Sequence, residues 1–277
     1  MNAIRSILVH LDGSPGSAVR LATAGALARQ HGAEVHALFA VKSLLTLAAY
    51  DFPPGPDFSV LMTEYDRERR AAARAQFDAQ AGTDVQLHWH EAEGEPISAV
   101  SQAALCTDLL VLGQRDAATQ GLVPSDFVES VIINSGKPAL VLPYIASAPA
   151  ACRVALVAWK NSREAARALS DALPLLARAD QVHVAIWPDH EGADTAGADP
   201  LAFLRSHGIN AQRHLQSPLS GRATRELGEL LLSLAVDLGA DLLVMGCYGH
   251  GRAREWVLGG ASRTLLSSMT VPLLMSH

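Results

Sequence analysis

Short, uninterrupted apolar runs recur along the chain, and each ends in a group of turn-forming residues. Residues 7–11 form such a run, and a helical stretch over 17–30 follows and stops at Gly32. Residues 154–159 repeat this plan, with a helix expected over 163–177. Continuous apolar runs are typical of strands that are buried on both faces of a parallel sheet. The pattern therefore predicts strands that alternate with helices.

Segments in the first half of the chain match segments in the second half, in the same order. The pairs are 7–12 with 154–159, 35–37 with 182–184, 107–113 with 240–246, and 137–142 with 271–275. Such self-similarity indicates two copies of one structural unit. A link rich in Pro and Ala separates them, so we place a first domain at 1–147 and a second at 148–277.

The predicted fold class is α/β, with two tandem open twisted parallel sheets and helices on both faces, in a Rossmann-like arrangement. In such sheets, ligands bind beyond the C-terminal strand ends, where the strand order reverses. Long loops are expected over 50–59, which is rich in proline, and over 188–200. A charged helix is expected to begin at Val60, after the first loop.

Composition and charge narrow the range of functions. Hydrophobic residues make up 49% of the 277 positions, and aromatic residues only 5%. The net charge of −6 argues against nucleic acid as a partner, because nucleic-acid binding needs a basic face. No apolar run is long enough to predict a membrane span. Three scattered cysteines, an odd number, favour a reducing, cytoplasmic location over a disulfide framework.

The strongest local feature is a glycine-rich segment after the strand expected at 242–246. It holds Gly246, Gly249, Gly259 and Gly260, and Ser262 follows shortly after. Glycines let the backbone approach an anion closely, and the N–H groups at the start of a helix expected over 261–268 suit a phosphate group. The alternative is that these glycines only form tight turns at a strand end.

The spacing of Gly246, Gly249 and Gly259 resembles the G-x2-G-x9-G-[S/T] nucleotide motif of the universal stress protein family. The resemblance covers nearly the whole chain, twice, including the final Val-Pro-apolar strands. It implies five parallel strands in each copy and packing of the copies through the last strand, as an intrachain pseudo-dimer. In that family the glycine loop wraps the ribose and phosphates of ATP. A further homodimer of whole chains stays open.

The chain departs from the family pattern in both copies. ATP-binding members carry Asp at the end of the first strand, where it contacts adenine. The first copy keeps it as Asp12, whereas the second has Trp159, and Gly260 stands where the motif ends in Ser or Thr. The glycine loop of the first copy has acquired Asp116 and Asp126, whose charges repel phosphate. We therefore expect no phosphate site in the first copy.

The resulting hypothesis is a stress-response protein that binds ATP, another adenine nucleotide or a related small phosphate-bearing ligand in its second domain. Its phosphates would be held by Gly246, Gly249, Gly259, Gly260 and Ser262, and Trp159 would border the base. No catalytic residue is identified, and any hydrolysis is expected to be slow. The alternative is a ligand-independent interaction or scaffold protein with vestigial pockets. An enzyme is a third hypothesis, with His250 as its one candidate residue.

Histidines and a cysteine offer weaker candidates. His88 and His90 place two imidazoles on one face of a strand, but zinc needs further ligands, so we expect a solvated edge and no metal site. His36 and His183 match between the copies and are expected to make structural hydrogen bonds. Cys247 lies within the glycine segment, where a small filler residue is favoured over a redox-sensing thiol.

Overall fold

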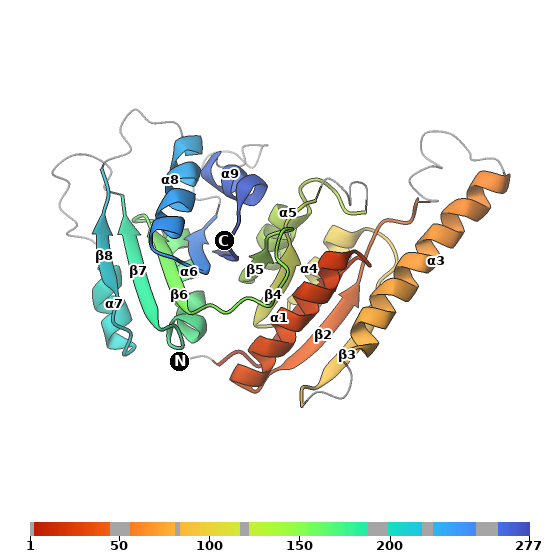
Figure 1. The fold of residues 1–277 in the computed structure, drawn as a ribbon, viewed down its shortest axis with the longest axis horizontal. Helices are drawn as coiled ribbons and strands as arrows, with labels where there is room; N and C mark the ends of the chain where they lie inside the picture. The colour runs from red at the N-terminus through yellow and green to blue at the C-terminus, as the bar shows by residue number, and fades with distance from the viewer. Residues whose placement is uncertain are drawn as a thin grey trace. The chain divides into compact units, whose positions relative to one another are not determined.

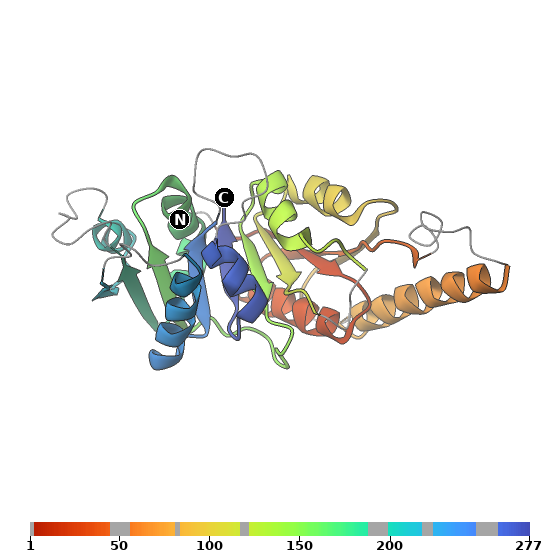
Figure 2. The same ribbon diagram turned by 90° about the horizontal axis from the view of Figure 1, so that it is seen from above.

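The structure, a computed structural model, describes residues 3–44, 56–80, 84–116, 122–187, 199–217, 224–247 and 260–277. It confirms an α/β fold of mostly parallel strands with helices on both faces (Figures 1 and 2). Contacts divide the chain into two compact units. The N-terminal unit contains residues 4–137 and 146–149, and the C-terminal unit contains 138–145 and 150–277.

In the N-terminal unit, four parallel strands follow the order β3-β2-β1-β4. The elements are β1 (Ser6–Leu11), α1 (Pro15–His31), β2 (Glu34–Phe39), α3 (Pro56–Asp78), β3 (Leu87–Glu91), α4 (Pro96–Ala104), β4 (Leu109–Gly113) and α5 (Phe127–Ser135). Helices α1 and α3 cover one face of this sheet, and α4 and α5 the other (Figure 2). Helix α1 ends where predicted, because Gly32 adopts the left-handed φ of 67° that caps a helix.

In the C-terminal unit, the strands follow the order β5-β10-β9-β6-β7-β8. The elements are β5 (Ala139–Leu142), β6 (Val154–Trp159), α6 (Arg163–Leu176), β7 (Gln181–Ile186), α7 (Pro200–Ser206), β8 (Gln212–Leu215), α8 (Thr224–Asp237), β9 (Leu242–Gly246), α9 (Gly260–Ser268) and β10 (Leu273–Ser276). All neighbouring strands are parallel except β5, which pairs antiparallel with β10. The last strands of the two copies are therefore paired.

The buried strands explain this architecture. Ile7 and Val9 of β1, like Leu156 and Val157 of β6, are at most 1% exposed, as expected for strands covered on both faces. None of the described helices combines the length and the apolar character that a membrane crossing requires.

The predicted loop over 50–59 is wrong in its last part. Helix α3 begins at Pro56 instead of Val60. Proline lacks a backbone N–H and has a helical φ, so the first turn of a helix accepts it readily. Residues 50–55 and 188–198 lie outside the described residues, and Pro200 begins α7 in the same way.

Candidate functional site

The candidate site lies at the C-terminal strand ends of the C-terminal unit. Strand β6 ends at Trp159 and β9 ends at Gly246, and the two strands pair with Ala158 opposite Met245. Trp159 and Gly246 thus occupy adjacent strand ends. Strand β6 pairs with β7 on one side and with β9 on the other, so the strand order reverses at β6. In open α/β sheets, ligands bind beyond the strand ends at such a point.

Gly246 also has a packing role. A Cβ atom at this position would lie 2.5 Å from the amide nitrogen of Ala165 and 2.6 Å from the carbonyl oxygen of Glu164, both in the first turn of α6. These are main-chain atoms, which cannot yield without moving the helix. The close approach of β9 to α6 therefore requires glycine here, whether or not a ligand binds.

Helix α9 begins at Gly260, within one residue of the predicted start. It packs closely on α8 because Gly228 has no side chain: a Cβ there would lie 2.9 Å from the Cβ of Thr264. Ser262, in the first turn of α9, is buried, with 4% of its surface exposed. Gly249 and Gly259, which the sequence assigns to the phosphate loop, lie outside the described residues, as does His250.

Trp159 is 6% exposed, so its indole is packed within the unit. Near it, Glu164 is a buried carboxylate that the sequence analysis missed. Arg163 donates from Nε to Glu164 Oε1 at 2.6 Å. Burial alone would raise the pKa of Glu164, but hydrogen bonds from Arg163, the backbone and Ser162 lower it, so the group is ionised.

In the first copy, Asp12 is already engaged by its own protein. Its Oδ1 accepts hydrogen bonds from the hydroxyls of Ser14 at 2.6 Å and Ser17 at 2.7 Å, and Arg20 Nη2 lies 2.7 Å away. Burial opposes ionisation of Asp12, but the charges of Arg20 and His10 and these hydrogen bonds hold its pKa well below the usual range. We call these residues (His10, Asp12, Ser14, Ser17 and Arg20) the Asp12 cluster.

The Asp12 cluster fills the strand ends of the first copy. Arg20 Nε donates to the carbonyl oxygen of His10 at 2.8 Å, and the Arg20 side chain leaves no room for a Cβ atom at Gly113, where β4 ends. The ring of Phe127 lies 4.6 Å from that of His10. Phe127 and Asp126 stand where the second copy has Gly260 and Gly259, so an aromatic ring replaces a loop of glycines.

The second copy has no equivalent of this ionic cluster among its described residues. Trp159 replaces Asp12, and Arg167, which matches Arg20, is about half exposed and lies 3.6 Å from Asp171 of its own helix. The eight-residue spacing of Asp12 and Arg20 could have indicated their ion pair from the sequence, because it places Arg20 in the first turns of the helix that follows the strand end at Asp12.

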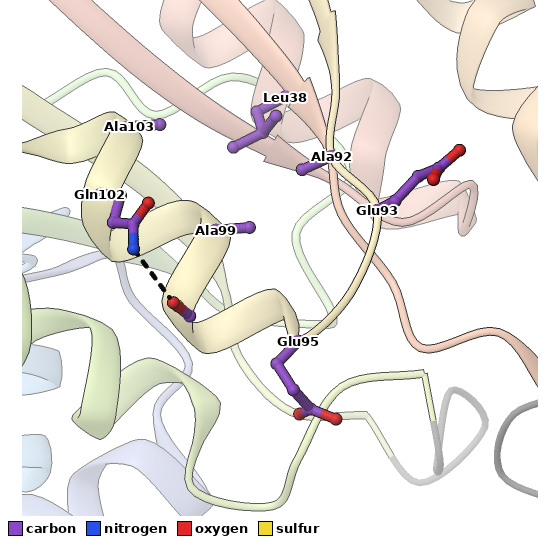
Figure 3. A pocket seen from close by; sticks show the side chains of 8 residues that line it. Leu38, Ala92, Glu93, Glu95, Ala99, Gln102 and Ala103 are labelled. Atoms are coloured by element: carbon purple, nitrogen blue, oxygen red, sulfur yellow. Dashed lines mark hydrogen bonds between the residues drawn. The ribbon is translucent and has the colours of Figure 1, made fainter.

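A hollow beside α4 in the N-terminal unit does not suit phosphate. Figure 3 shows Leu38, Ala99 and Ala103 lining it together with the carboxylates of Glu93 and Glu95. None of its eight lining residues is basic. Lys42 Nζ lies 3.0 Å from Glu95 Oε2 and offsets its charge, but Glu93 adds a second carboxylate at the wall, which repels an anionic ligand.

The predicted structural hydrogen bonds of the matched histidines are confirmed. His36 Nδ1 lies 3.1 Å from His90 Nε2, and His183 Nδ1 lies 3.0 Å from His214 Nε2. Cys247 is fully buried, and its thiol donates to the carbonyl oxygen of Ser276 at 3.3 Å. That environment fits a small packing residue better than a redox-sensing thiol, which needs access to solvent.

Fold and site together define a duplicated α/β protein with an open parallel sheet and a candidate ligand site at its strand ends. The model of the universal stress protein family matches residues 3–143 and 152–277. The chain belongs to the universal stress protein family. The comparison with curated proteins gave no match.

Solved structures support the same fold. A universal stress protein from Archaeoglobus fulgidus DSM 4304 is 18% identical, with 98% of this chain and 97% of that chain covered and a TM-score of 0.69. A functionally unknown protein from Pseudomonas aeruginosa PAO1 is 17% identical, with 99% and 92% covered and a TM-score of 0.61. A putative universal stress protein from Pseudomonas aeruginosa UCBPP-PA14 is also 17% identical, with 99% and 93% covered and a TM-score of 0.61.

Proposed function

We propose that this protein binds an adenine nucleotide such as ATP, or a related phosphate-bearing ligand, in its second copy, and that it does so without efficient catalysis. One observation carries the proposal, namely the contrast between the two copies. The strand ends of the first copy are filled by the Asp12 cluster and Phe127. The second copy has lost the matching Asp and keeps its glycines, with a helix that starts at Gly260.

The phosphate groups would meet the backbone at the start of α9. The first N–H groups of a helix have no partner within the helix, and its dipole favours an anion there. Gly246, Gly249, Gly259 and Gly260 would let the backbone reach the phosphate, Ser262 would add a hydroxyl donor, and Trp159 would border the base. Cys106 and Cys152 are free thiols, which fits a reducing, cytoplasmic setting.

Calorimetric titration of the full chain with ATP, ADP and AMP tests the proposal. We expect one nucleotide per chain and no turnover on the timescale of the titration. Absence of binding at millimolar nucleotide would reject a nucleotide ligand. Mass spectrometry of ligand released from the protein purified from its host would then identify any other bound phosphate compound.

The first copy supplies the matched variant. Replacing Gly259 by Asp and Gly260 by Phe gives the second copy the residues of the first copy at these positions, and we expect nucleotide affinity to fall by at least about tenfold. Asp126→Asn in the first copy is the control, because it changes the same position in the copy whose strand ends are filled. Far-UV circular dichroism of both variants checks that they are folded.

The alternative, a ligand-independent interaction protein, is favoured by one specific observation, the burial of Trp159. If the indole fills the base pocket, Trp159→Leu opens it and nucleotide affinity rises. If the indole stacks on the base, the same change removes roughly 1–3 kcal/mol and affinity falls. If neither the wild type nor Trp159→Leu binds nucleotide, and nucleotide leaves both melting temperatures unchanged, the result supports the scaffold function.

A further inference from the structure

Four titratable side chains gather at the outer edge of the N-terminal sheet. Glu34 and His36 lie on β2, and His88 and His90 lie on the edge strand β3. The strands are parallel, with His36 directly opposite His88. Since residues two apart on a strand share a face, all four side chains lie on one face of the sheet.

The other face of these strands is the apolar core. Trp89, between the two histidines of β3, packs its ring 5.4 Å from Phe77 of α3 and 6.4 Å from Phe39 of β2. The four polar side chains therefore point to the face opposite α3. Their backbone positions are fixed by a well-packed sheet, so their spacing is set by the fold.

The distances within this group suit a metal ion. Glu34 Oε1 lies 3.2 Å from His36 Nε2, and Glu34 Oε2 lies 3.4 Å from His88 Nε2. One ligand atom from each of the three residues lies within 4.8 Å of the others. Zinc bonds of about 2.0–2.1 Å place neighbouring ligand atoms of a tetrahedral site about 3.3 Å apart.

Access from solvent is open. The side chains of His36, Glu34 and His88 are 26%, 41% and 44% exposed, respectively. An ion can therefore reach the group without any opening of the fold, and water can occupy a remaining coordination position.

We propose that Glu34, His36 and His88 bind one divalent transition-metal ion of the zinc class, with water completing a tetrahedral site. Two imidazoles with one carboxylate favour zinc over magnesium or calcium, which prefer oxygen ligands alone. The sequence analysis expected no metal site, because His88 and His90 lacked a third ligand near them in the chain. Strand pairing brings that ligand from β2.

His90 has a different role in this site. Its Nε2 lies 3.1 Å from His36 Nδ1. When His36 binds metal through Nε2, its Nδ1 keeps the proton and donates it to His90, which fixes the orientation of the liganding ring.

The second copy gives an internal comparison. His183 and His214 repeat the hydrogen-bonded pair at 3.0 Å. Gln181 stands at the position of Glu34, and Gln212, opposite His183, stands at that of His88. The histidine pair alone therefore belongs to both copies, whereas the complete ligand set belongs to the first. In the described part of the chain, Glu34, His36 and His88 are the one group of this kind.

Titration of the full chain, without a histidine tag and after treatment with a chelator, tests the site. We expect calorimetry to give one tightly bound zinc per chain, and cobalt(II) to give the visible absorption of a tetrahedral site. The double variant Glu34→Gln, His88→Gln carries the residues of the second copy, so the fold tolerates them, and zinc affinity should fall by at least about tenfold. His214→Gln is the control and should leave affinity unchanged.

Two results would overturn the proposal. One is the absence of binding at submillimolar zinc, which would leave the group as polar side chains on a solvated edge. The other is an equal affinity in the wild type and in the double variant, which would place the zinc elsewhere. The single variant His88→Gln changes only an exposed side chain and decides the question if the double variant is unfolded. No nucleotide enters these measurements, so their outcome is independent of the proposed nucleotide site.

Discussion

Gly246 can be tested for its packing role without any ligand. We expect Gly246→Ala to lower the free energy of unfolding by about 1–3 kcal/mol, because the new methyl group collides with main-chain atoms of Glu164 and Ala165. Urea unfolding measures this change. Gly25→Ala in α1 is the control, since its Cβ would lie 3.7 Å from the side-chain atom Arg29 Nη1, an ordinary contact distance, and it should stabilise the helix by up to about 1 kcal/mol. Equal stability of Gly246→Ala and wild type would contradict the packing argument.

His10 predicts a dependence of stability on pH. Burial, followed by the charge of Arg20, lowers the pKa of His10 to about 4. In the unfolded chain its pKa is about 6.5, so between these values the unfolded state takes up a proton that the native state refuses. The free energy of unfolding that depends on a neutral His10 is therefore at its full value above about pH 6.5. It decreases as the pH falls towards about 4.

Replacing His10 by Gln removes this titration and keeps a donor for the carbonyl oxygen of Ala40, which accepts from the ring at 2.8 Å. We expect the free energy of unfolding of His10→Gln to fall less steeply than that of the wild type over this pH range. Urea titrations at several pH values give both slopes. Parallel slopes would mean that His10 has the same pKa in the native and the unfolded protein.

At the scale of elements, apolar runs and glycines in the sequence predicted the fold well. Strand β6 was predicted at 154–159, and α6 and α9 were predicted within one residue at each end. Contacts between elements were harder to predict, because strand register depends on packing across the whole sheet. The Asp12–Arg20 ion pair and the approach of His36 to His88 were therefore missed. The matching of His36 with His183 in the two copies could have indicated that histidines interact at this position.

The proposed metal site makes a constructive prediction at this scale. Gln181→Glu with Gln212→His gives the second copy the ligand set of the first, in the same strand register. Among the described residues, the Nε2 atom of His183 is buried and has no hydrogen-bond partner, so no protein group competes there with an ion. We expect zinc stoichiometry to rise from one to two ions per chain, measured by calorimetry. A stoichiometry that stays at one would show that these ligands in this register are not sufficient.

For the whole molecule, duplication explains why two copies of one fold carry different chemistry. The first copy neutralises its buried Asp12 with its own Arg20, so its strand ends need no ligand for charge balance. The second copy has Trp159 and glycines at the matching positions. Each copy has also kept the histidine pair on its second and third strands, and only the first has surrounded it with further metal ligands.

The pairing of β5 with β10 joins the last strands of the two copies, and a double-mutant cycle measures it. Leu140 lies opposite Leu274, and both are fully buried. We expect Leu140→Val and Leu274→Val each to lower the free energy of unfolding by on the order of 1 kcal/mol, since each removes one buried methylene. Because the two side chains are in contact across the strands, the double variant should depart from additivity by at least about 0.5 kcal/mol.

The control cycle combines Leu140→Val with Val184→Ala. Val184 is also fully buried, but it lies on β7, and β10, β9 and β6 separate that strand from β5 in the order of the sheet. Neighbouring strands are about 4.8 Å apart, so these two side chains share no contact, and their effects should add within about 0.5 kcal/mol. Additivity in both cycles would mean that β5 and β10 do not pair in solution. Coupling in the first cycle alone would establish that the last strand of each copy protects the edge of the other, since an unpaired strand edge invites association with further chains.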